Sequence, residues 1–344
     1  MPFQYKTVEA GGKVDAIIKT GNKAVYPIIF PSDYSGLGSI NCYVYQNGED
    51  YTLIDAGIKN EGFEQFFYRK LKEYNIEINQ ITGIILTHFH NDHIGIVNQI
   101  ANEYPIPVYA SEIAIPRLKC EDDYLQQKLS FYYDLYEQYG VPEFARERMA
   151  KMENTLQNKE QVMIYPPIMK LEDGQAIGGL RVMTAPGHSP DSICLFDEET
   201  GWLFAGDFLL ATGMTNALID HDESGNVTNP ISKYIDSIEK MKAYNVRTVF
   251  AGHKEIYENL NEVMEKSLSK IEYKLQKVVS KIGEGNHTAK QLGDAIYGAR
   301  FAKYFTFIIS EIIGLTLLAE QRGLIERELR GGDWCFSVTS LIDQ

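Results

Sequence analysis

The sequence predicts an α/β domain that is interrupted by a helical insertion and followed by a small, mostly helical domain. Strand patterns and amphipathic helices alternate in the first three quarters of the chain, a helix-favouring stretch interrupts them at residues 111–163, and helices dominate the last quarter. A chain of 344 residues is long enough for two domains of ordinary size. We therefore expect a larger domain at residues 1–261 and a smaller one at residues 262–344.

The first elements are expected to be short strands and one helix. Residues 24–30, 40–45 and 51–55 are apolar runs bounded by Gly, Ser and Asn clusters, as expected of strands. Residues 61–74 place Phe and Leu at helical spacing, and residues 81–86 form a short apolar run typical of a buried strand. A strand, a helix and a further strand in succession are typical of an α/β fold.

The insertion at residues 111–163 is rich in aromatic residues and is broken at Gly140-Val-Pro142. Its tyrosines have two interpretations. They could form the packed face of a helix pair, which is the more common arrangement, or they could belong to a lid over a pocket. Tyrosine suits a lid because it offers an apolar ring and a polar hydroxyl.

Strands return after the insertion, where residues 164–204 carry strand patterns separated by turn signals. A helix is expected over residues 229–244, because Asn229 can cap its N-terminus and Pro230 suits its first position. Residues 246–250 form another short apolar run and predict a buried strand.

The C-terminal region predicts three helices and a hairpin of winged-helix type, at residues 262–282, 288–297, 304–322 and 323–338. Eleven Lys and Arg balance 11 Asp and Glu after residue 261, so the net charge of −14 lies in the first 261 residues. A winged helix that reads DNA should carry a basic surface, whereas residues 304–322 are mostly apolar. We therefore expect this helix to pack against the larger domain or a second subunit in a homodimer, with no nucleic-acid partner.

Composition also bears on the compartment. The four Cys lie far apart and form no C-x-x-C pair, which argues against a disulfide framework or a zinc ribbon. The N-terminus lacks the pattern of a secretory signal. The most apolar stretch, residues 305–319, contains Glu311 and is shorter than the ~20 residues that a membrane-spanning helix needs. These observations predict a cytoplasmic protein with no membrane partner.

Histidines are few, and five of the seven fall in three short segments that each follow a predicted buried strand. Imidazole and carboxylate ligands suit zinc, iron and similar metals. Seven such ligands are the number expected for two metal ions that share one bridge, about 3.5–4 Å apart, with a hydroxide between them as nucleophile. The candidate metal ligands are His88, His90, Asp92, His93, His188, Asp207 and His253.

The segment Thr87–His93 matches the T-H-x-H-x-D-H signature of the metallo-β-lactamase superfamily. The remaining candidates follow in the order of that family, in Pro-Gly-His188, Gly-Asp207 and Gly-His253, and the resemblance extends from Val14 to about Leu260. It implies an αββα sandwich with two divalent metal ions at one edge, with zinc as the first expectation and iron or manganese as alternatives.

The resemblance also implies the role of each ligand. Asp92 would additionally act as a catalytic residue that orients the hydroxide or takes up its proton. One metal ion would be held by His88, His90 and His188, and the other by Asp92, His93 and His253, with Asp207 bridging both.

The full ligand set resembles glyoxalase II, and residues 230–238 together with the C-terminal region resemble lactamase-β-2-like proteins that carry a winged-helix tail. Three positions depart from such relatives. Asp191 replaces a usual Gly after His188-Ser-Pro, and Leu210 replaces the Tyr of homoserine-lactone lactonases. Lys254 follows the last His, where Gly is frequent, and either contacts an anionic substrate or lies in solvent.

These observations predict a metal-dependent hydrolase in which the hydroxide between two metal ions attacks a small ester, thioester or lactone. The aromatic insertion favours a substrate with an apolar portion. Two alternatives belong to the same superfamily: a phosphodiesterase or ribonuclease, and a mononuclear iron persulfide dioxygenase. The non-enzyme alternative is a winged-helix DNA-binding regulator, against which the intact ligand set argues.

Overall fold

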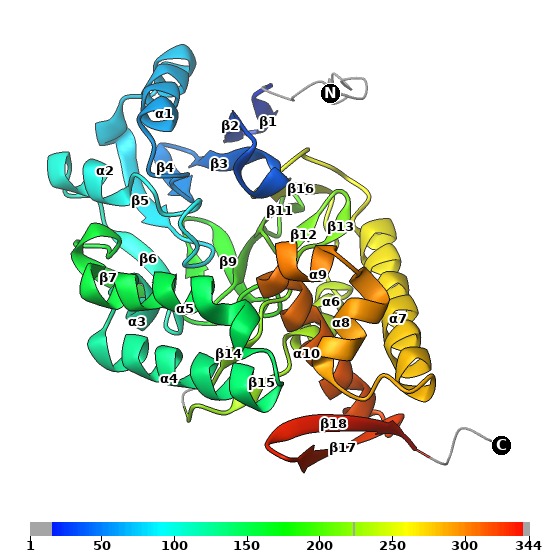
Figure 1. Cartoon of the computed structure of the whole chain (residues 1–344). Helices are drawn as coiled ribbons and strands as arrows, with labels where there is room; N and C mark the ends of the chain where they lie inside the picture. The colour runs from blue at the N-terminus through cyan, green and yellow to red at the C-terminus, as the bar shows by residue number, and fades with distance from the viewer. Residues whose placement is uncertain (1–15, 223, 340–344) are drawn as a thin grey trace.

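The computed structural model describes residues 16–222 and 224–339, which form two mixed β-sheets with helices on their outer faces (Figure 1). The first sheet has seven strands in sequence order: β1 (Ile18–Thr20), β2 (Lys23–Ser32), β3 (Gly38–Asn47), β4 (Asp50–Ile54), β5 (Ile81–Ile85), β6 (Val108–Ser111) and β7 (Ile168–Leu171). The second has the order β16 (Thr248–Ala251), β11 (Trp202–Gly206), β10 (Ile193–Asp197), β9 (Leu180–Thr184) and β8 (Ala176–Ile177).

The helices of the first part of the chain are α1 (Glu61–Tyr74), α2 (Val97–Glu103), α3 (Ala114–Leu118), α4 (Asp122–Gln138), α5 (Pro142–Gln157) and α6 (Pro230–Met241). Two small hairpins pair β12 (Leu209–Leu210) with β13 (Gly213–Met214) and β14 (Asp220–His221) with β15 (Val227–Thr228). Three 3-10 turns are η1 (Tyr34–Gly36), η2 (Ile78–Gln80) and η3 (Lys159–Gln161).

Side-chain alternation along the strands divides the core into layers. In β3, Val44 points toward α1 and α2, whereas Tyr43 and Tyr45 point toward the second sheet and contact Phe204 of β11. On the outer face of the second sheet, Tyr234 of α6 is buried in the same apolar cluster as residues of β10 and β11. The layers therefore run helix, sheet, sheet, helix, which confirms the predicted αββα sandwich.

Most predicted elements lie within a few residues of their observed positions. The helix predicted at residues 61–74 is α1, with the same bounds. The Asn229 side chain accepts hydrogen bonds from the backbone N–H groups of Ile231 and Ser232, and Pro230 occupies the first position of α6, as predicted.

The insertion is helical, as predicted, and consists of α3, α4 and α5. Tyr132 and Tyr136 of α4 and Tyr139 just after it are buried, and the Tyr136 ring contacts Phe305 in the C-terminal region. These three tyrosines form a packed helix face, the more common of the two arrangements considered.

The C-terminal region contains the three expected helices and the expected hairpin, together with the short additional helix α9. Its elements are α7 (Leu260–Gly283), α8 (Ala289–Tyr297), α9 (Arg300–Lys303), α10 (Phe305–Gln321), β17 (Ile325–Arg330) and β18 (Asp333–Val338). The apolar α10 is buried, as expected, and contacts α6, α7 and α8 (Figure 1). Gly314 allows a close approach to α6, since a Cβ there would lie 2.9 Å from Ile231. One continuous apolar cluster joins this region to the second sheet.

Within residues 16–222 and 224–339, no helix combines the length and apolar character needed to cross a membrane.

Candidate metal centre

The seven predicted ligands lie on loops that leave the ends of strands from both sheets. His88, His90, Asp92 and His93 lie in the loop after β5, and His188 lies in the loop between β9 and β10. Asp207 follows β11 directly, and His253 follows β16 after one intervening Gly. Because β11 and β16 are parallel neighbours, their carboxyl ends bring Asp207 and His253 to one edge of the sandwich.

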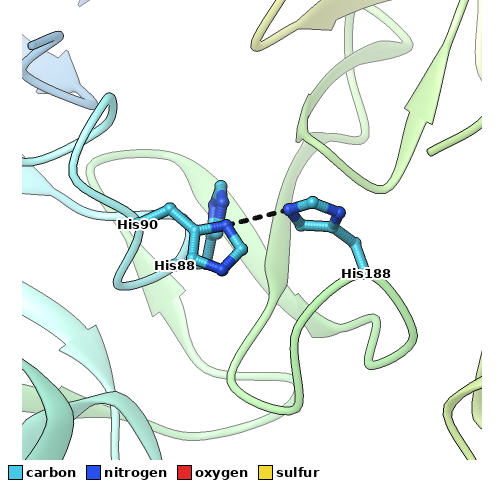
Figure 2. Close-up of side chains that lie close together, drawn as sticks. All are labelled: His88, His90 and His188. Atoms are coloured by element: carbon cyan, nitrogen blue, oxygen red, sulfur yellow. Dashed lines mark hydrogen bonds between the residues drawn. The ribbon is translucent and has the colours of Figure 1, made fainter. Parts of the chain in front are cut away.

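The first group of ligand atoms belongs to His88, His90 and His188, whose nearest ring nitrogens lie within 4.8 Å of one another. Figure 2 shows the His90 and His188 rings joined by a hydrogen bond, with His88 beside His90. The Nε2 atom of His188 lies 2.9 Å from Nδ1 of His90. Three imidazoles that converge in this way form a site suited to a first-row metal ion.

The second group consists of Asp92, His93 and His253, with ligand atoms that are also within 4.8 Å of one another. The His253 Nε2 atom lies 3.5 Å from Oδ2 of Asp92. Asp207 lies between the two groups: its Oδ2 is 3.1 Å from Nε2 of His253 and 3.6 Å from Nε2 of His188, and its Oδ1 is 3.4 Å from Nε2 of His93. All seven predicted residues are thus brought together.

The residues present fit a metal ion, because buried ligand atoms point at one another without hydrogen-bond partners. Within the described chain, no partner is found for the buried Nε2 atoms of His88, His93 and His253 or for Oδ1 of Asp207. Burying such groups unpaired is costly, so a cation that accepts their lone pairs accounts for the arrangement. A Cβ at Gly252 would lie 2.4 Å from Oδ1 of Asp207, so glycine keeps this space open.

Hydrogen bonds on the opposite ring nitrogen fix the orientation of three ligands. The Nδ1 atoms of His93, His188 and His253 lie 2.8, 2.9 and 2.6 Å from Asp55 Oδ2, Asn216 O and Ser39 O. An Nδ1–H that donates to oxygen leaves Nε2 unprotonated and available to a metal ion.

Asp55 was not predicted as a site residue, although it directly follows β4 in the segment Leu53-Ile-Asp-Ala-Gly57. Its backbone is left-handed, with φ of 58°. Besides facing His93, its carboxylate accepts hydrogen bonds from the backbone N–H and the hydroxyl of Thr87, both at 2.8 Å. The sequence does contain a signal for Asp55: an aspartate stands at the end of a predicted buried strand, directly before Ala-Gly. A carboxylate in such a buried position needs a specific partner.

Burial and neighbouring charges set the protonation states of the ligands. Burial, together with the nearby His93 and His90, lowers the pKa of His88 well below its ordinary value. Burial raises the pKa of Asp207, but His253 and His93 outweigh it and hold that pKa well below its usual range. A neutral imidazole and an ionised carboxylate are the states that bind metal ions.

For His93, neighbouring negative charges affect the pKa more strongly than burial does. Burial lowers its pKa, but the charges of Asp55 and Asp207 outweigh burial and raise the pKa well above the ordinary value. Without a metal ion these two carboxylates therefore favour the protonated form of His93, whereas a metal ion binds the neutral form.

The ligands open onto a cleft of about 860 Å³. One wall carries His90, Asp92, His188 and Asp207, and the opposite wall comes from α7, α8, α9 and α10. No described residue of α4 or α5 lines this cleft, so in this structure those helices form no lid over it. The C-terminal wall was not predicted from the sequence.

The three positions that depart from relatives have different environments. Asp191 is buried beside Ser189, and its backbone C=O accepts a hydrogen bond from Ser111 at 2.8 Å, so it supports the loop that carries His188. Leu210 and Lys254 both line the cleft. Lys254 is half-buried there, and its Nζ donates a hydrogen bond to the Thr212 hydroxyl.

Comparison with known proteins agrees with this geometry. Residues 35–253 match the family model described as the metallo-beta-lactamase superfamily. The "Probable metallo-hydrolase YqjP" of Bacillus subtilis (strain 168) is 26% identical over 295 residues, which cover 84% of this chain and 90% of that protein. The "Atrochrysone carboxyl ACP thioesterase" of Aspergillus fumigatus is 20% identical over 276 residues, which cover 80% of this chain and 70% of that protein.

Two solved structures share the fold over nearly the whole chain. A metallo-beta-lactamase family protein of Thermus thermophilus superposes with a TM-score of 0.72 at 21% identity, covering 92% of this chain and 98% of that one. A beta-lactamase domain protein of Burkholderia ambifaria superposes with a TM-score of 0.76 at 18% identity, covering 96% of each chain. As its signature predicted, the chain belongs to the metallo-beta-lactamase superfamily and is a metallo-hydrolase.

Proposed function

We propose that this protein is a dinuclear metal-dependent hydrolase that cleaves a small ester, thioester or lactone, with a thioester as the preferred substrate. The observation that carries the proposal is the position of Asp207 between two groups of three ligands, of which the first contains one buried, unpartnered Nε2 atom (His88) and the second contains two (His93 and His253). A single carboxylate within reach of both groups is the arrangement expected of a bridging ligand.

The residues for each ion follow from the two groups. When bound, two zinc ions (or iron or manganese in their place) would supply an activated hydroxide and polarise the substrate carbonyl. The ligand sets are His88, His90 and His188 for one ion and Asp92, His93 and His253 for the other, with Asp207 shared.

Asp92 is the residue proposed to handle the proton of the nucleophile. Asp92 lines the cleft, and its Oδ2 lies 3.5 Å from Nε2 of His253, so this largely buried carboxylate faces the space that a substrate would enter. A carboxylate in that position can orient the attacking hydroxide and accept its proton. Asp55, which faces the opposite nitrogen of His93, is proposed as a positioning residue.

The cleft favours a substrate with an apolar portion. Five apolar side chains line it together with the polar ligands, namely Phe89, Leu210, Met214, Phe307 and Ile308. An acyl thioester combines an apolar chain with an activated carbonyl, and the similarity to a protein named as an acyl carrier protein thioesterase supports this choice. The acidic charge of the chain disfavours a long polyanion, which counts against the ribonuclease alternative.

The test combines metal analysis with a substrate panel. We expect about two metal ions per chain, hydrolysis of thioesters that stops on chelation and returns with zinc, and loss of turnover in Asp207→Asn. One iron per chain with oxygen consumption on persulfides would instead support the dioxygenase. Cleavage of single-stranded RNA without thioesterase activity would support the nuclease, and binding of genomic DNA without any turnover would support the regulator.

A further inference from the structure

The residue after the last ligand has an unusual backbone conformation. Lys254 has a φ of 62°, in the left-handed region that favours glycine and costs other residues free energy. Its backbone is held there by two hydrogen bonds: its N–H donates to Ser39 Oγ at 2.9 Å, and its C=O accepts from Asn41 Nδ2 at 3.0 Å. Glycine would adopt this conformation without strain, so a lysine at this position suggests that its side chain takes part in binding or catalysis.

The side chain of Lys254 extends into the cleft rather than away from it. Its Nζ donates a hydrogen bond to Thr212 Oγ1, 3.1 Å away, in the turn between β12 and β13. Both residues line the cleft that holds the metal ligands. Lys254 follows the candidate ligand His253 directly, so its backbone is anchored at the edge of the metal site while its side chain lines the cleft.

A second cation faces the same cleft from the C-terminal wall. Arg300 is the first residue of α9, is exposed and lines the cleft with Lys254. In the described parts of the chain, neither side chain forms an ion pair with a carboxylate, whereas the neighbouring Lys274 is paired with Glu311. Lys254 and Arg300 thus bring two positive charges without ion-pair partners to the lining of this cleft, in a chain whose net charge is −14.

Positive charge continues from the cleft along one face of α7. Lys266, Lys270 and Lys274 are spaced four residues apart and therefore share a helix face. Burial and the proximity of Lys274, Lys266 and Lys254 lower the pKa of Lys270, although Glu311 opposes this. This face would attract an anionic group that extends beyond the reacting bond.

We propose that Lys254 and Arg300 form an anion-binding subsite and that the substrate is therefore an acyl thioester whose thiol portion carries a carboxylate or phosphate. The inference rests on the proposed hydrolase function and adds the charge of the substrate to it. Glutathione represents the carboxylate form of such a thiol and coenzyme A the phosphate form, and the test distinguishes them. A charge-assisted hydrogen bond from each cation would position the thiol portion while the acyl chain lies along the apolar wall.

The kinetic test compares three thioesters with the same octanoyl group, made from neutral N-acetylcysteamine, from glutathione and from coenzyme A. The quantity compared is kcat/KM for an anionic thioester divided by kcat/KM for the neutral one. We expect a ratio above one for glutathione or for coenzyme A, a fall of about tenfold in Lys254→Met, and a retained ratio in Lys254→Arg. Lys277→Met, which removes a lysine of α7 outside the cleft, should leave the ratio at the wild-type value.

Two further measurements distinguish loss of the subsite from loss of folding and from failure of the proposed function: the thermal midpoint of Lys254→Gly and the binding affinity of Lys254→Met. Lys254→Gly relieves the left-handed strain, so its thermal midpoint should equal or exceed that of the wild type while the anion preference is lost. Calorimetry should show that coenzyme A or glutathione binds the metal-loaded protein and binds at least about tenfold more weakly to Lys254→Met. Equal binding by the wild type and Lys254→Met, or an unchanged kinetic ratio, would overturn the subsite. Binding that depends on Lys254 without turnover of any thioester would instead overturn the proposed function alone.

Discussion

Asp55 Oδ2 lies 2.8 Å from Nδ1 of His93, so a residue at the end of β4 orients a predicted metal ligand 38 positions later in the chain. The same carboxylate holds the first residue of the ligand loop through two hydrogen bonds to Thr87. One side chain thus sets both the start of the loop and the ring orientation of His93. Its left-handed backbone is explained by this double role, because the strain is offset by three polar contacts.

Replacing Asp55 should weaken metal binding without removing a ligand. In Asp55→Asn the amide is a weaker acceptor, so the Nδ1–H of His93 loses its anionic partner and its Nε2 becomes a poorer ligand. Metal affinity, measured by competition with a chromophoric chelator, should fall about 10- to 100-fold. Asp173→Asn, which alters an exposed carboxylate bound to Lys240, serves as the matched control. Unchanged affinity in Asp55→Asn would show that this contact only supports the fold.

A methyl group at Gly252 should displace the metal ions. A Cβ there would lie 2.4 Å from Oδ1 of Asp207 and 2.6 Å from Cε1 of His93, so both side chains must move. We expect Gly252→Ala to lose most bound metal and about 100-fold or more in turnover, because a shift of one ångström can have that cost at an active site. Metal content and kcat check this prediction.

The control for that substitution is Gly283→Ala at the end of α7, where a Cβ would meet Val338 at an ordinary 3.7 Å. It should retain wild-type metal content and turnover. Full metal occupancy in Gly252→Ala would show that the ligand cluster adapts and that the glycine is not required for the site.

The ligand set was predictable because each ligand lies in a loop that follows a buried strand. Short apolar runs mark those strands in the sequence, and strands that share a sheet edge bring their ends together whatever the intervening loops do. His188 and His253 could therefore be assigned to the site although 65 positions separate them. The left-handed conformation of Lys254 could not be predicted from the residue itself, because lysine rarely adopts it; the only signal was that Gly is frequent at this position in relatives.

The C-terminal wall of the cleft was not predictable, because it depends on tertiary packing. Arg300 reaches the cleft through the placement of α9 between α8 and α10, and α10 is positioned by its contacts with α6 and α7. The sequence predicted that the apolar α10 would be buried, which is confirmed. It did not specify which of its residues would face the substrate, because an almost uniformly apolar helix gives no clear polar face.

The ion pair between Lys23 and Asp197 should make stability depend on pH at both extremes. Burial raises the pKa of Asp197, but hydrogen bonds from Lys23 and Tyr45 outweigh it and hold that pKa below its ordinary value. A depressed carboxyl pKa stabilises the fold above the unfolded value of about 4, and this contribution is lost as pH falls further.

For Lys23, burial lowers the pKa, but hydrogen bonds to Asp197 and Glu199 outweigh burial and raise it. A raised lysine pKa stabilises the fold below about pH 10.4, and this contribution is lost as pH rises through the folded-state pKa. The contribution of this ion pair to the urea midpoint should therefore be constant between these limits and fall outside them. The fall below pH 4 should be shallower in Asp197→Asn, and an identical acid limb in both proteins would contradict the assignment.

Truncation of Ile313 tests whether the C-terminal region unfolds as a separate domain. Ile313 of α10 is fully buried in the cluster that also contains residues of β10, β11 and α6, so its loss removes contacts on both sides of the predicted boundary at residue 261. Ile313→Ala should lower the free energy of unfolding by about 2–5 kcal/mol, as large-to-small core substitutions do.

Because the apolar cluster is continuous, we expect one cooperative transition at a lower denaturant midpoint, with the same midpoint measured by circular dichroism and by tryptophan fluorescence. Trp202 in β11 and Trp334 in β18 report on the two regions. Two separate transitions, of which only the one reported by Trp334 shifts in Ile313→Ala, would show instead that residues 262–344 form an independent folding unit.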